Sequence, residues 1–221
     1  MTRHPKAAMA VLVIALLAIS CGASPTAPPP TPEPALSLSS LPFDETTKDY
    51  IWRSNILGYG GGIQTVRWKP GLKMKIFGDG FKKSDVEKAV ALIAELSLPI
   101  EFEVVNTRAE ANVVMELVYP IANLPAEACG LEGPDHVVMS EIMTGVGRYA
   151  LGQKANCMDR TRDHVHLAHG LLHILGLAEH TPDGPDADAL SGTKPVFRLG
   201  AITRASLPWI HSVPAATRVV R

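Results

Sequence analysis

The stretch HLAHGLLHILGLAEH (residues 166–180) is the most informative part of this chain. Five of the chain's eight histidines fall within residues 164–180, and His169 and His173 are four positions apart. Because an α-helix turns by ~100° per residue, side chains four positions apart project from the same face, one turn apart. The two imidazoles are therefore placed to share one metal ion.

Gly176 follows three residues after His173. A glycine there can take a positive φ, end the helix and reverse the chain. The residues that follow would return toward the helix and bring a third ligand, either Glu179 or His180. Neutral imidazole suits zinc, which accepts tetrahedral geometry. We therefore expect a zinc site built on His169, His173 and one residue of this turn.

The twelve residues HGLLHILGLAEH (169–180) resemble the motif of the metzincin branch of zinc metallopeptidases, H-E-x-x-H-x-x-G-x-x-H. The resemblance implies Zn²⁺ as cofactor, His169 and His173 as ligands, and hydrolysis of a peptide or protein substrate by metal-activated water. Strict spacing puts the third ligand at Glu179. A three-histidine ligand set, and the longer spacing of some zincins, favour His180.

Gly170 stands where this family has the glutamate that serves as general base. Glycine can neither accept nor donate a proton, and loss of a general base lowers a rate by ~10²–10⁴-fold. If His180 is the third ligand, Glu179 is a possible stand-in, as are Asp183 and Asp186 in the following loop. The catalytic residue is therefore unknown, and hydrolysis is expected to be weakened or lost.

Metzincins also place a methionine in a tight turn beneath the metal. The last methionine of this chain, Met158, precedes the histidine helix, so this feature is absent. The segment DADALSG (186–192) lies about where the turn is expected, and Leu190 is the apolar residue that would replace the methionine.

Periodic apolar patterns predict the remaining elements. The expected strands are 65–78 (with a turn at Pro70–Gly71), 100–105, 111–119 and 135–143, and the expected helices are 84–97 capped by Ser84, a helix to Leu175 capped by Thr161 or Asp163, and 199–212. This order predicts an α+β fold. We expect residues 41–221 to form one domain, similar to zincins, with a mixed twisted sheet, a backing helix, an active-site helix and a small C-terminal subdomain ending in a helix.

Three weaker signals complete this part of the chain. GYGGGIQT (58–65) lacks the Lys-Ser/Thr pair of a P-loop and is predicted to be a flexible entry into the first strand. The family resemblance makes the strand around His136–Met143 the expected edge for pairing with an extended peptide. His166 lies one turn before His169, and we expect it at the edge of a cleft, or supporting or replacing a ligand.

The first 20 residues combine a short basic start with an apolar run from Ala7 to Ile19. This run is shorter than the ~20 residues of a membrane span and is typical of a signal peptide. It ends in Ala18-Ile19-Ser20-Cys21, which resembles a bacterial lipobox and implies cleavage before Cys21 and lipid anchoring through it. An ordinary signal peptide or an anchor helix is the alternative. Residues 21–40 are proline-rich and predict an extended tether.

Export is consistent with the use of cysteine. With Cys21 lipidated, Cys129 and Cys157 remain as a pair in an oxidising compartment, and we expect a disulfide between them; two buried free thiols are the alternative. The formal charge of −1 and the pI of about 6.7 provide no electrostatic case for a nucleic-acid partner.

Three functions are compatible with these features. The first is a lipid-anchored, extracytoplasmic domain of zinc metallopeptidase type, with reduced activity. The second is a non-catalytic descendant that retains zinc for stability and binds peptides or envelope components. The third is sequestration of zinc, for which His164, His166 and His169 provide weak support.

Overall fold

The computed structural model of the chain describes residues 34–118, 136–137, 139–152, 160–192 and 195–221. All described elements belong to one compact unit, Glu33–Arg221. Cys21, Cys129, Cys157 and Met158 lie outside the described residues, as do the expected signal peptide and most of the tether. Among the described residues, no helix combines the length and apolar character needed to cross a membrane.

A five-stranded sheet forms one half of this unit, in the order β3-β2-β4-β6-β5. Its strands are β2 (Met74–Asp79), β3 (Phe102–Val104), β4 (Val113–Val118), β5 (His136–Val137) and β6 (Gly147–Gly152). β2, β3, β4 and β6 are mutually parallel, and β5 runs antiparallel to β6 at one edge. The expected mixed sheet is therefore confirmed at this level.

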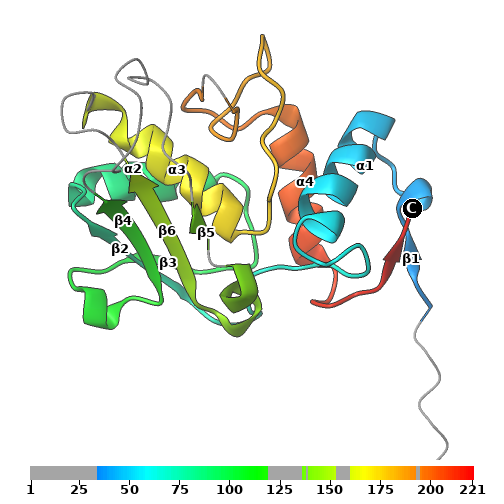
Figure 1. The fold of residues 1–221 in the computed structure, drawn as a ribbon, viewed down its shortest axis with the longest axis horizontal. Coiled ribbons are helices and arrows are strands. Elements are labelled where there is room, and N and C mark those ends of the chain that lie inside the picture. Colours follow the sequence, from blue (N-terminus) through cyan, green and yellow to red (C-terminus); the bar gives the residue numbers. More distant parts are fainter. Residues whose placement is uncertain (1–33, 119–135, 138, 153–159, 193–194) are drawn as a thin grey trace, which may run out of the picture. The chain divides into compact units, whose positions relative to one another are not determined.

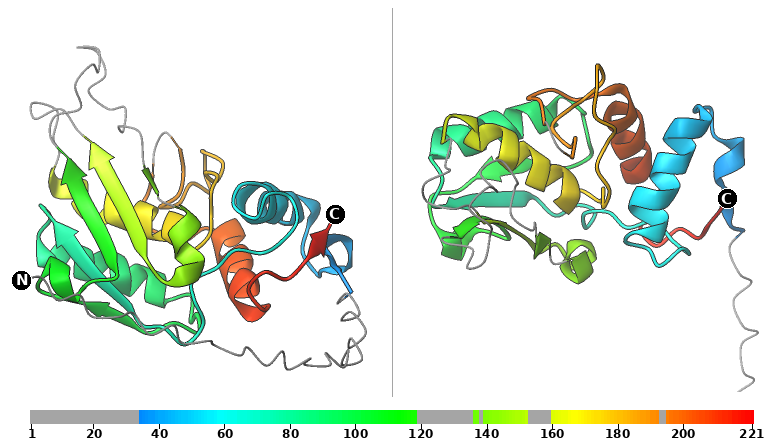
Figure 2. Two further views of the ribbon diagram at one scale, coloured as in Figure 1. Left: turned by 60° about the horizontal axis from the view of Figure 1, so that its bottom comes forward. Right: turned by 45° about the horizontal axis from the view of Figure 1, so that its top comes forward.

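Two helices, α2 (Lys83–Ala94) and α3 (Asp163–Ile174), pack against each other and cover one face of the sheet (Figures 1 and 2). The apolar stripe of α2 explains its position, because Val86, Ala89 and Ile93 are fully buried while the opposite side faces solvent. α3 is buried on almost every side. A helix enclosed in this way holds its side chains rigidly.

The other half of the unit contains helices from both ends of the chain. α1 (Glu45–Ile51) continues into a π-helix, η2 (Trp52–Leu57), and packs beside α4 (Ala201–Ser212) (Figure 1). β1 (Leu36–Ser37) pairs with β7 (Val219–Val220), which brings residues 36 and 219 side by side. The described residues thus contain four α-helices around a mixed sheet, which agrees with the α+β class at a coarse level.

Several predicted boundaries are wrong. The segment 65–73 is not a regular strand. A 3-10 helix, Met139–Thr144, occupies residues 139–143 of the expected strand 135–143. Strand β6 was not predicted at all. The N-cap residues of α2 and α3 are Lys82 and Arg162, so neither Ser84 nor Thr161 or Asp163 is an N-cap. The expected C-terminal helix is confirmed as α4, with Pro208 inside it.

The segment before the sheet differs most from expectation. Residues 58–63, predicted to be a flexible entry to a strand, form a turn that closes η2, and Gly61 and Gly62 have positive φ. Gln64 then forms an isolated bridge with Arg218. The helical segment 45–57 had no predicted counterpart.

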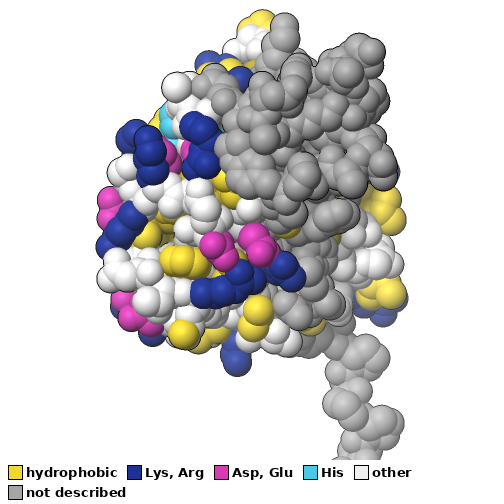
Figure 3. All heavy atoms as spheres, turned by 60° about the vertical axis from the view of Figure 1, so that its left-hand side comes forward, with side chains coloured by type: hydrophobic (Ala, Val, Ile, Leu, Met, Phe, Trp, Pro, Cys, Tyr) yellow, Lys and Arg dark blue, Asp and Glu magenta, His cyan; other side chains and the backbone are white. Residues whose placement is uncertain are grey.

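Charged side chains of both signs are mixed on the face shown in Figure 3. Ion pairs among the described residues follow the same pattern: Arg108 lies 2.6 Å from Asp79, and Lys73 lies 3.3 Å from Glu101. In the part of this face that Figure 3 draws in colour, positive and negative side chains are interspersed.

Candidate metal centre

Helix α3 carries two of the predicted ligands in its buried interior. His169 is 0% exposed and His173 is 5% exposed. Their apolar neighbours Leu171, Leu172 and Ile174 are each 0% exposed and belong to the main core cluster. The helix therefore cannot rotate without exposing these leucine and isoleucine side chains, and the two imidazoles keep a common direction.

Each of these two rings is oriented by a hydrogen bond at Nδ1. His169 Nδ1 lies 2.9 Å from the carbonyl oxygen of Ala189, and His173 Nδ1 lies 2.5 Å from that of Leu177. Because a carbonyl oxygen can only accept, the Nδ1 of each neutral ring carries the hydrogen and donates it. The two Nε2 atoms then carry the lone pairs, and they lie 3.0 Å apart.

His180 reaches the same point after the chain reverses. The positive φ expected for Gly176 is confirmed, at 114°. The His180 ring centroid lies 4.9 Å from that of His169 and 5.4 Å from that of His173. One ligand atom from each of the three histidines lies within 4.8 Å of the others, so this group could hold a metal ion.

The chemistry of this donor set fits a divalent cation. In a tetrahedral zinc site with Zn–N bonds of ~2.0–2.1 Å, two ligand nitrogens are ~3.3–3.4 Å apart. The separation of the two Nε2 atoms, 3.0 Å, is within a few tenths of an ångström of that value. The two Nε2 atoms lie at hydrogen-bond distance from each other, so either a shared hydrogen or a shared cation makes this arrangement favourable when both Nδ1 atoms donate to carbonyls.

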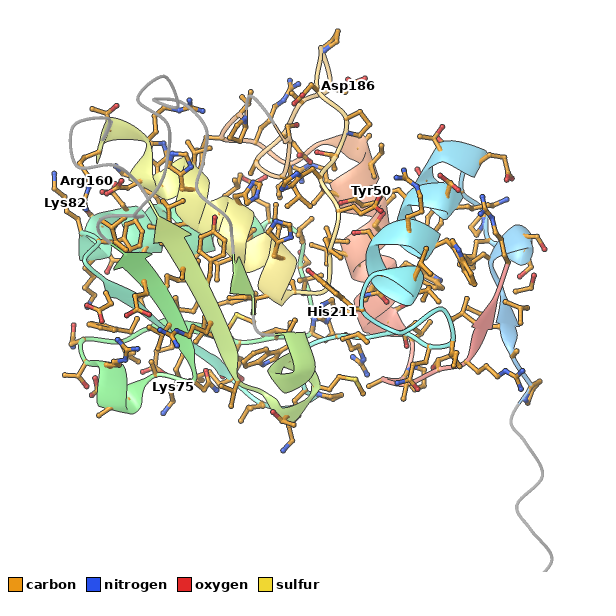
Figure 4. All side chains as sticks on the ribbon, viewed as in Figure 1. Tyr50, Lys75, Lys82, Arg160, Asp186 and His211 are labelled. Carbon is orange, nitrogen blue, oxygen red and sulfur yellow. The ribbon has the colours of Figure 1, made fainter. Side chains whose placement is uncertain are left out.

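The group contains three imidazoles and, among the described residues, no carboxylate. Glu179, the alternative third ligand and possible base, instead forms an ion pair with Arg53, with Nη1 and Oε2 2.5 Å apart. Asp183 and Asp186 are exposed in the loop after His180, and neither belongs to the group (Asp186 is labelled in Figure 4).

Gly170, at the position where the metzincin motif has its glutamate, lies against the ring of Tyr149 from β6. A Cβ atom on residue 170 would lie 2.5 Å from Cδ1 and Cγ of that ring. Tyr149 is 0% exposed, so its ring has little space into which it can move. Sequence reasoning missed this contact because it did not predict β6, although GRYALG (147–152) has the alternation of a strand.

A tight turn at Asp188–Ser191 lies beneath His169, in the segment where Leu190 was expected to replace a methionine. Leu190 is 0% exposed, and the Ala189 carbonyl is the one that accepts from His169. Ser191 N–H donates to the carbonyl of Asp188 at 3.1 Å, which closes the turn.

The buried carboxylate of Asp188 holds this turn in place. It accepts four hydrogen bonds of 2.5–3.1 Å, from the hydroxyls of Thr181 and Thr203 and the amides of Leu190 and Gly200. Gly200 is the N-cap of α4 and Thr203 lies in its first turn, where the helix dipole favours a negative charge. This residue was not singled out from the sequence, because a single aspartate in a loop carries no distinctive pattern.

The two earlier histidines lie outside the three-histidine group. His164 packs edge-on against Phe197, with ring centroids 4.6 Å apart, and His166 is 7% exposed. His164 and His166 are close to His169 in the sequence. Among the described residues, however, they do not join it in a group of possible metal ligands.

No protein-family model matches this chain, and no curated protein matches it. The assignment of a function therefore depends on the residues of this site and on the motif that they form.

Proposed function

We propose that this chain is a zinc-binding domain of metallopeptidase type, in which His169, His173 and His180 hold the metal. The observation that carries this proposal is the convergence of three ligand nitrogens within 4.8 Å, two of them on rings whose Nδ1 atoms face carbonyl oxygens. A histidine that binds a metal usually donates a hydrogen bond from its other ring N–H to a carbonyl or carboxylate, which fixes the tautomer.

The arrangement of the elements supports a zincin-like fold. A mixed sheet with an antiparallel edge strand is backed by α2 and by α3, which carries two of the three histidines, and the chain ends in a smaller part that contains α4. In this proposal an extended peptide pairs along β5, the edge strand next to β6.

When bound, zinc supplies Lewis acidity, which polarises a carbonyl group and makes water more acidic. The chain supplies the orientation of the ligands through the carbonyls of Ala189 and Leu177 and the burial of two of the three rings. It offers no side chain at position 170 to move a proton. We therefore propose that peptide hydrolysis is slow, by the ~10²–10⁴-fold that a general base contributes.

A non-catalytic role is the second candidate, and the contact between Gly170 and Tyr149 favours it. The buried ring of Tyr149 occupies the space that the side chain of a glutamate would enter. In this packing, a side chain at position 170 has no space, which is consistent with a domain that does not use a general base there. Such a domain would retain zinc for stability and bind a peptide or an envelope component.

Metal analysis of the purified full chain tests the proposal. We expect one zinc ion per chain in the wild type, and weak or no retention in His173→Ala. Absence of zinc from the wild type after reconstitution would reject the metal site. Hydrolysis of a general protein substrate by the zinc-loaded chain then separates the two candidates, since only the first predicts cleavage that a chelator abolishes.

The chain is proposed to act outside the cytoplasm, anchored to the cell envelope through a lipid on Cys21, with a disulfide between Cys129 and Cys157. The lipobox-like sequence and the proline-rich tether support this location. Mass spectrometry of the mature amino terminus tests it: a diacylglyceryl adduct on Cys21 is expected, and an unmodified residue 1 would reject it.

A further inference from the structure

The segment that carries His180 lacks regular secondary structure. Residues 177–180 follow the end of α3 and precede an isolated bridge between Thr181 and Ser191. Unlike His169 and His173, His180 is exposed, so burial in a helix does not fix its position. Contacts made by the backbone around it help to hold this residue near the other two histidines.

These contacts come from one short segment near the amino end of the domain, which we call the N-terminal cradle (residues 50–59). It binds a backbone group of every residue from Gly176 to Glu179. The hydrogen bonds are Asn55 Nδ2 to Gly176 O (2.7 Å), Tyr59 OH to Leu177 O (3.1 Å), Ala178 N to Ser54 O (3.0 Å), Glu179 N to Ser54 Oγ (3.0 Å) and Tyr50 OH to Glu179 O (2.7 Å).

The two bonds nearest to the third histidine involve Tyr50 and Ser54. They bind the carbonyl and the amide of Glu179, the residue immediately before His180. Figure 4 shows Tyr50 extending from α1 toward the chain that follows α3. Tyr50 is 1% exposed and Ser54 is 0% exposed, so water does not compete for these hydrogen bonds.

The π-helix η2 makes this arrangement possible. Gly58 N–H donates to the carbonyl of Arg53, five residues back, and Tyr59 N–H donates to that of Asn55. The carbonyl of Ser54, which lies between these acceptors in the sequence, accepts from Ala178 instead. The close approach requires a glycine at 58, because a Cβ atom there would lie 2.6 Å from Cβ of Ala178. Such π-turns are often found at functional sites.

The cradle is itself fixed to the rest of the domain. Asn55 is 0% exposed; its Nδ2 also donates to the carbonyl of Val66 at 2.6 Å, and its Oδ1 accepts from Val66 N–H at 3.1 Å. One amide side chain thus links the cradle, the chain entering the sheet and the turn at Gly176. Because the cradle is itself held in place, it can fix the position of the segment that carries His180.

We propose that the N-terminal cradle positions His180 as the third metal ligand, with Tyr50 and Ser54 as the positioning residues closest to it. This inference rests on the proposed metal site. It assigns a role in metal binding to residues outside the three-histidine group. Tyr50 and Ser54 lie 129 and 125 positions before Glu179 in the chain.

The test measures zinc affinity and the visible spectrum of the Co²⁺-substituted full chain for Tyr50→Phe, Ser54→Ala and the double variant. Loss of an interaction that orients a ligand lowers metal affinity by ~10–100-fold. We expect each single variant to weaken zinc binding by about tenfold, at the lower end of that range. The d–d absorption bands of bound Co²⁺ should also weaken, because water replaces His180 as a ligand when His180 is no longer held in position.

Thr65→Val is the matched control. Thr65 is also 0% exposed, and its hydroxyl bonds the C-terminal segment rather than residues 176–180: it donates to the carbonyl of Pro214 at 3.1 Å and accepts from Thr217 N–H at 3.1 Å. This variant should lower the unfolding temperature of the metal-free chain about as much as Tyr50→Phe. Its zinc affinity and cobalt spectrum should stay those of the wild type.

The His180→Ala background provides a double-mutant cycle. If the cradle acts through His180, Tyr50→Phe has no further effect on zinc affinity once that ring is removed. An equal loss of affinity in both backgrounds would overturn the inference, as would wild-type affinity and spectrum in Tyr50→Phe and Ser54→Ala. A wild-type chain that binds neither Zn²⁺ nor Co²⁺ would instead reject the metal site itself.

Discussion

The ring of Tyr149 lies against the backbone of Gly170, so closely that a Cβ atom at position 170 would be 2.5 Å from two of its carbons. One of these carbons is Cγ, which rotation of the ring about χ2 does not move, and a change of χ1 has little space because Tyr149 is 0% exposed. The lack of a side chain at position 170 is therefore linked to a second feature of the core. In the proposed metal site, we expect that a glutamate introduced at position 170 alone would not create a hydrolytic site.

The first prediction concerns Gly170→Ala. Alanine is favoured over glycine in a helix by ~1 kcal/mol, but forcing an additional group into a packed core costs ~1–3 kcal/mol. We expect a net destabilisation of up to ~2 kcal/mol. In a Tyr149→Ala background the same change should stabilise the chain, and urea unfolding of the four variants measures this coupling.

The same contact predicts the outcome of Gly170→Glu. This variant should be less stable than Gly170→Ala and should show no gain in peptidase activity, whereas Gly170→Glu combined with Tyr149→Ala has room for the carboxylate. Efficient cleavage by the single variant would contradict the role given to Tyr149.

The second prediction concerns stabilisation by zinc. A ligand that binds only the folded state at 100 times its dissociation constant adds ~2.7 kcal/mol to the free energy of unfolding. For a domain of this size that corresponds to an increase of ~5–10 °C in the unfolding temperature. The increase should be lost in His173→Ala and kept in His164→Ala, since His164 lies outside the three-histidine group. Calorimetry with and without a chelator measures it.

The third prediction concerns Asp188→Ala. The substitution leaves two hydroxyls and two amides of a buried site without their acceptor. Buried groups left unsatisfied cost ~1–3 kcal/mol each, partly offset by relaxation, so we expect a loss of ~3–5 kcal/mol. Asp186→Ala, in the exposed part of the same loop, should change stability by less than ~0.5 kcal/mol. Similar losses in the two variants would be inconsistent with the role of Asp188.

The fourth prediction is a pH dependence caused by His211, labelled in Figure 4. Burial lowers the pKa of this ring from 6.5 to about 4, and its Nε2 donates to the carbonyl of Leu175 at 2.9 Å. The unfolded chain takes up a proton near pH 6.5 that the folded chain takes up only near pH 4. The free energy of unfolding therefore has its full contribution from His211 above pH 6.5 and decreases as the pH falls toward 4.

The size of this pH dependence follows from the lowered pKa of His211. Between pH 7 and pH 5 the contribution falls by ~2 kcal/mol. His211→Gln retains a donor for Leu175 but does not titrate, so its free energy of unfolding should fall by ~2 kcal/mol less over this interval. Chemical unfolding of both metal-free chains at each pH tests this, and parallel pH profiles would count against a buried neutral His211.

The fifth prediction separates backbone strain from crowding at two glycines with positive φ. Gly176 has a φ of 114°, and a Cβ atom there would lie 2.7 Å from the carbonyl oxygen of Val66. Gly184 has a φ of 123° but nothing within 4 Å of such an atom. Gly184→Ala should cost ~1–2 kcal/mol from the strained φ. Gly176→Ala should cost at least ~1 kcal/mol more and reduce zinc affinity, because it displaces the turn that leads to His180.

The features that depend on near neighbours in the chain could be predicted from the sequence. The spacing of His169, His173 and Gly176 is a property of one helix and its end, so it follows from helical geometry and from the conformational freedom of glycine. The amphipathic pattern of 84–97 and the alternation of 100–105 likewise depend on near neighbours in the chain. The corresponding elements α2 and β3 are present, although with shifted ends.

The sequence alone did not reveal the partners that approach from distant parts of the chain. Whether Glu179 or His180 faces the other two histidines depends on Arg53 and Tyr50, which are more than 120 residues away. The contact between Tyr149 and Gly170, and the carboxylate of Asp188 beneath the turn, likewise exist only once strands and helices pack. Sequence periodicity reports which face of an element is apolar, whereas only the tertiary structure decides which groups meet there, because packing brings together residues that have no regular spacing.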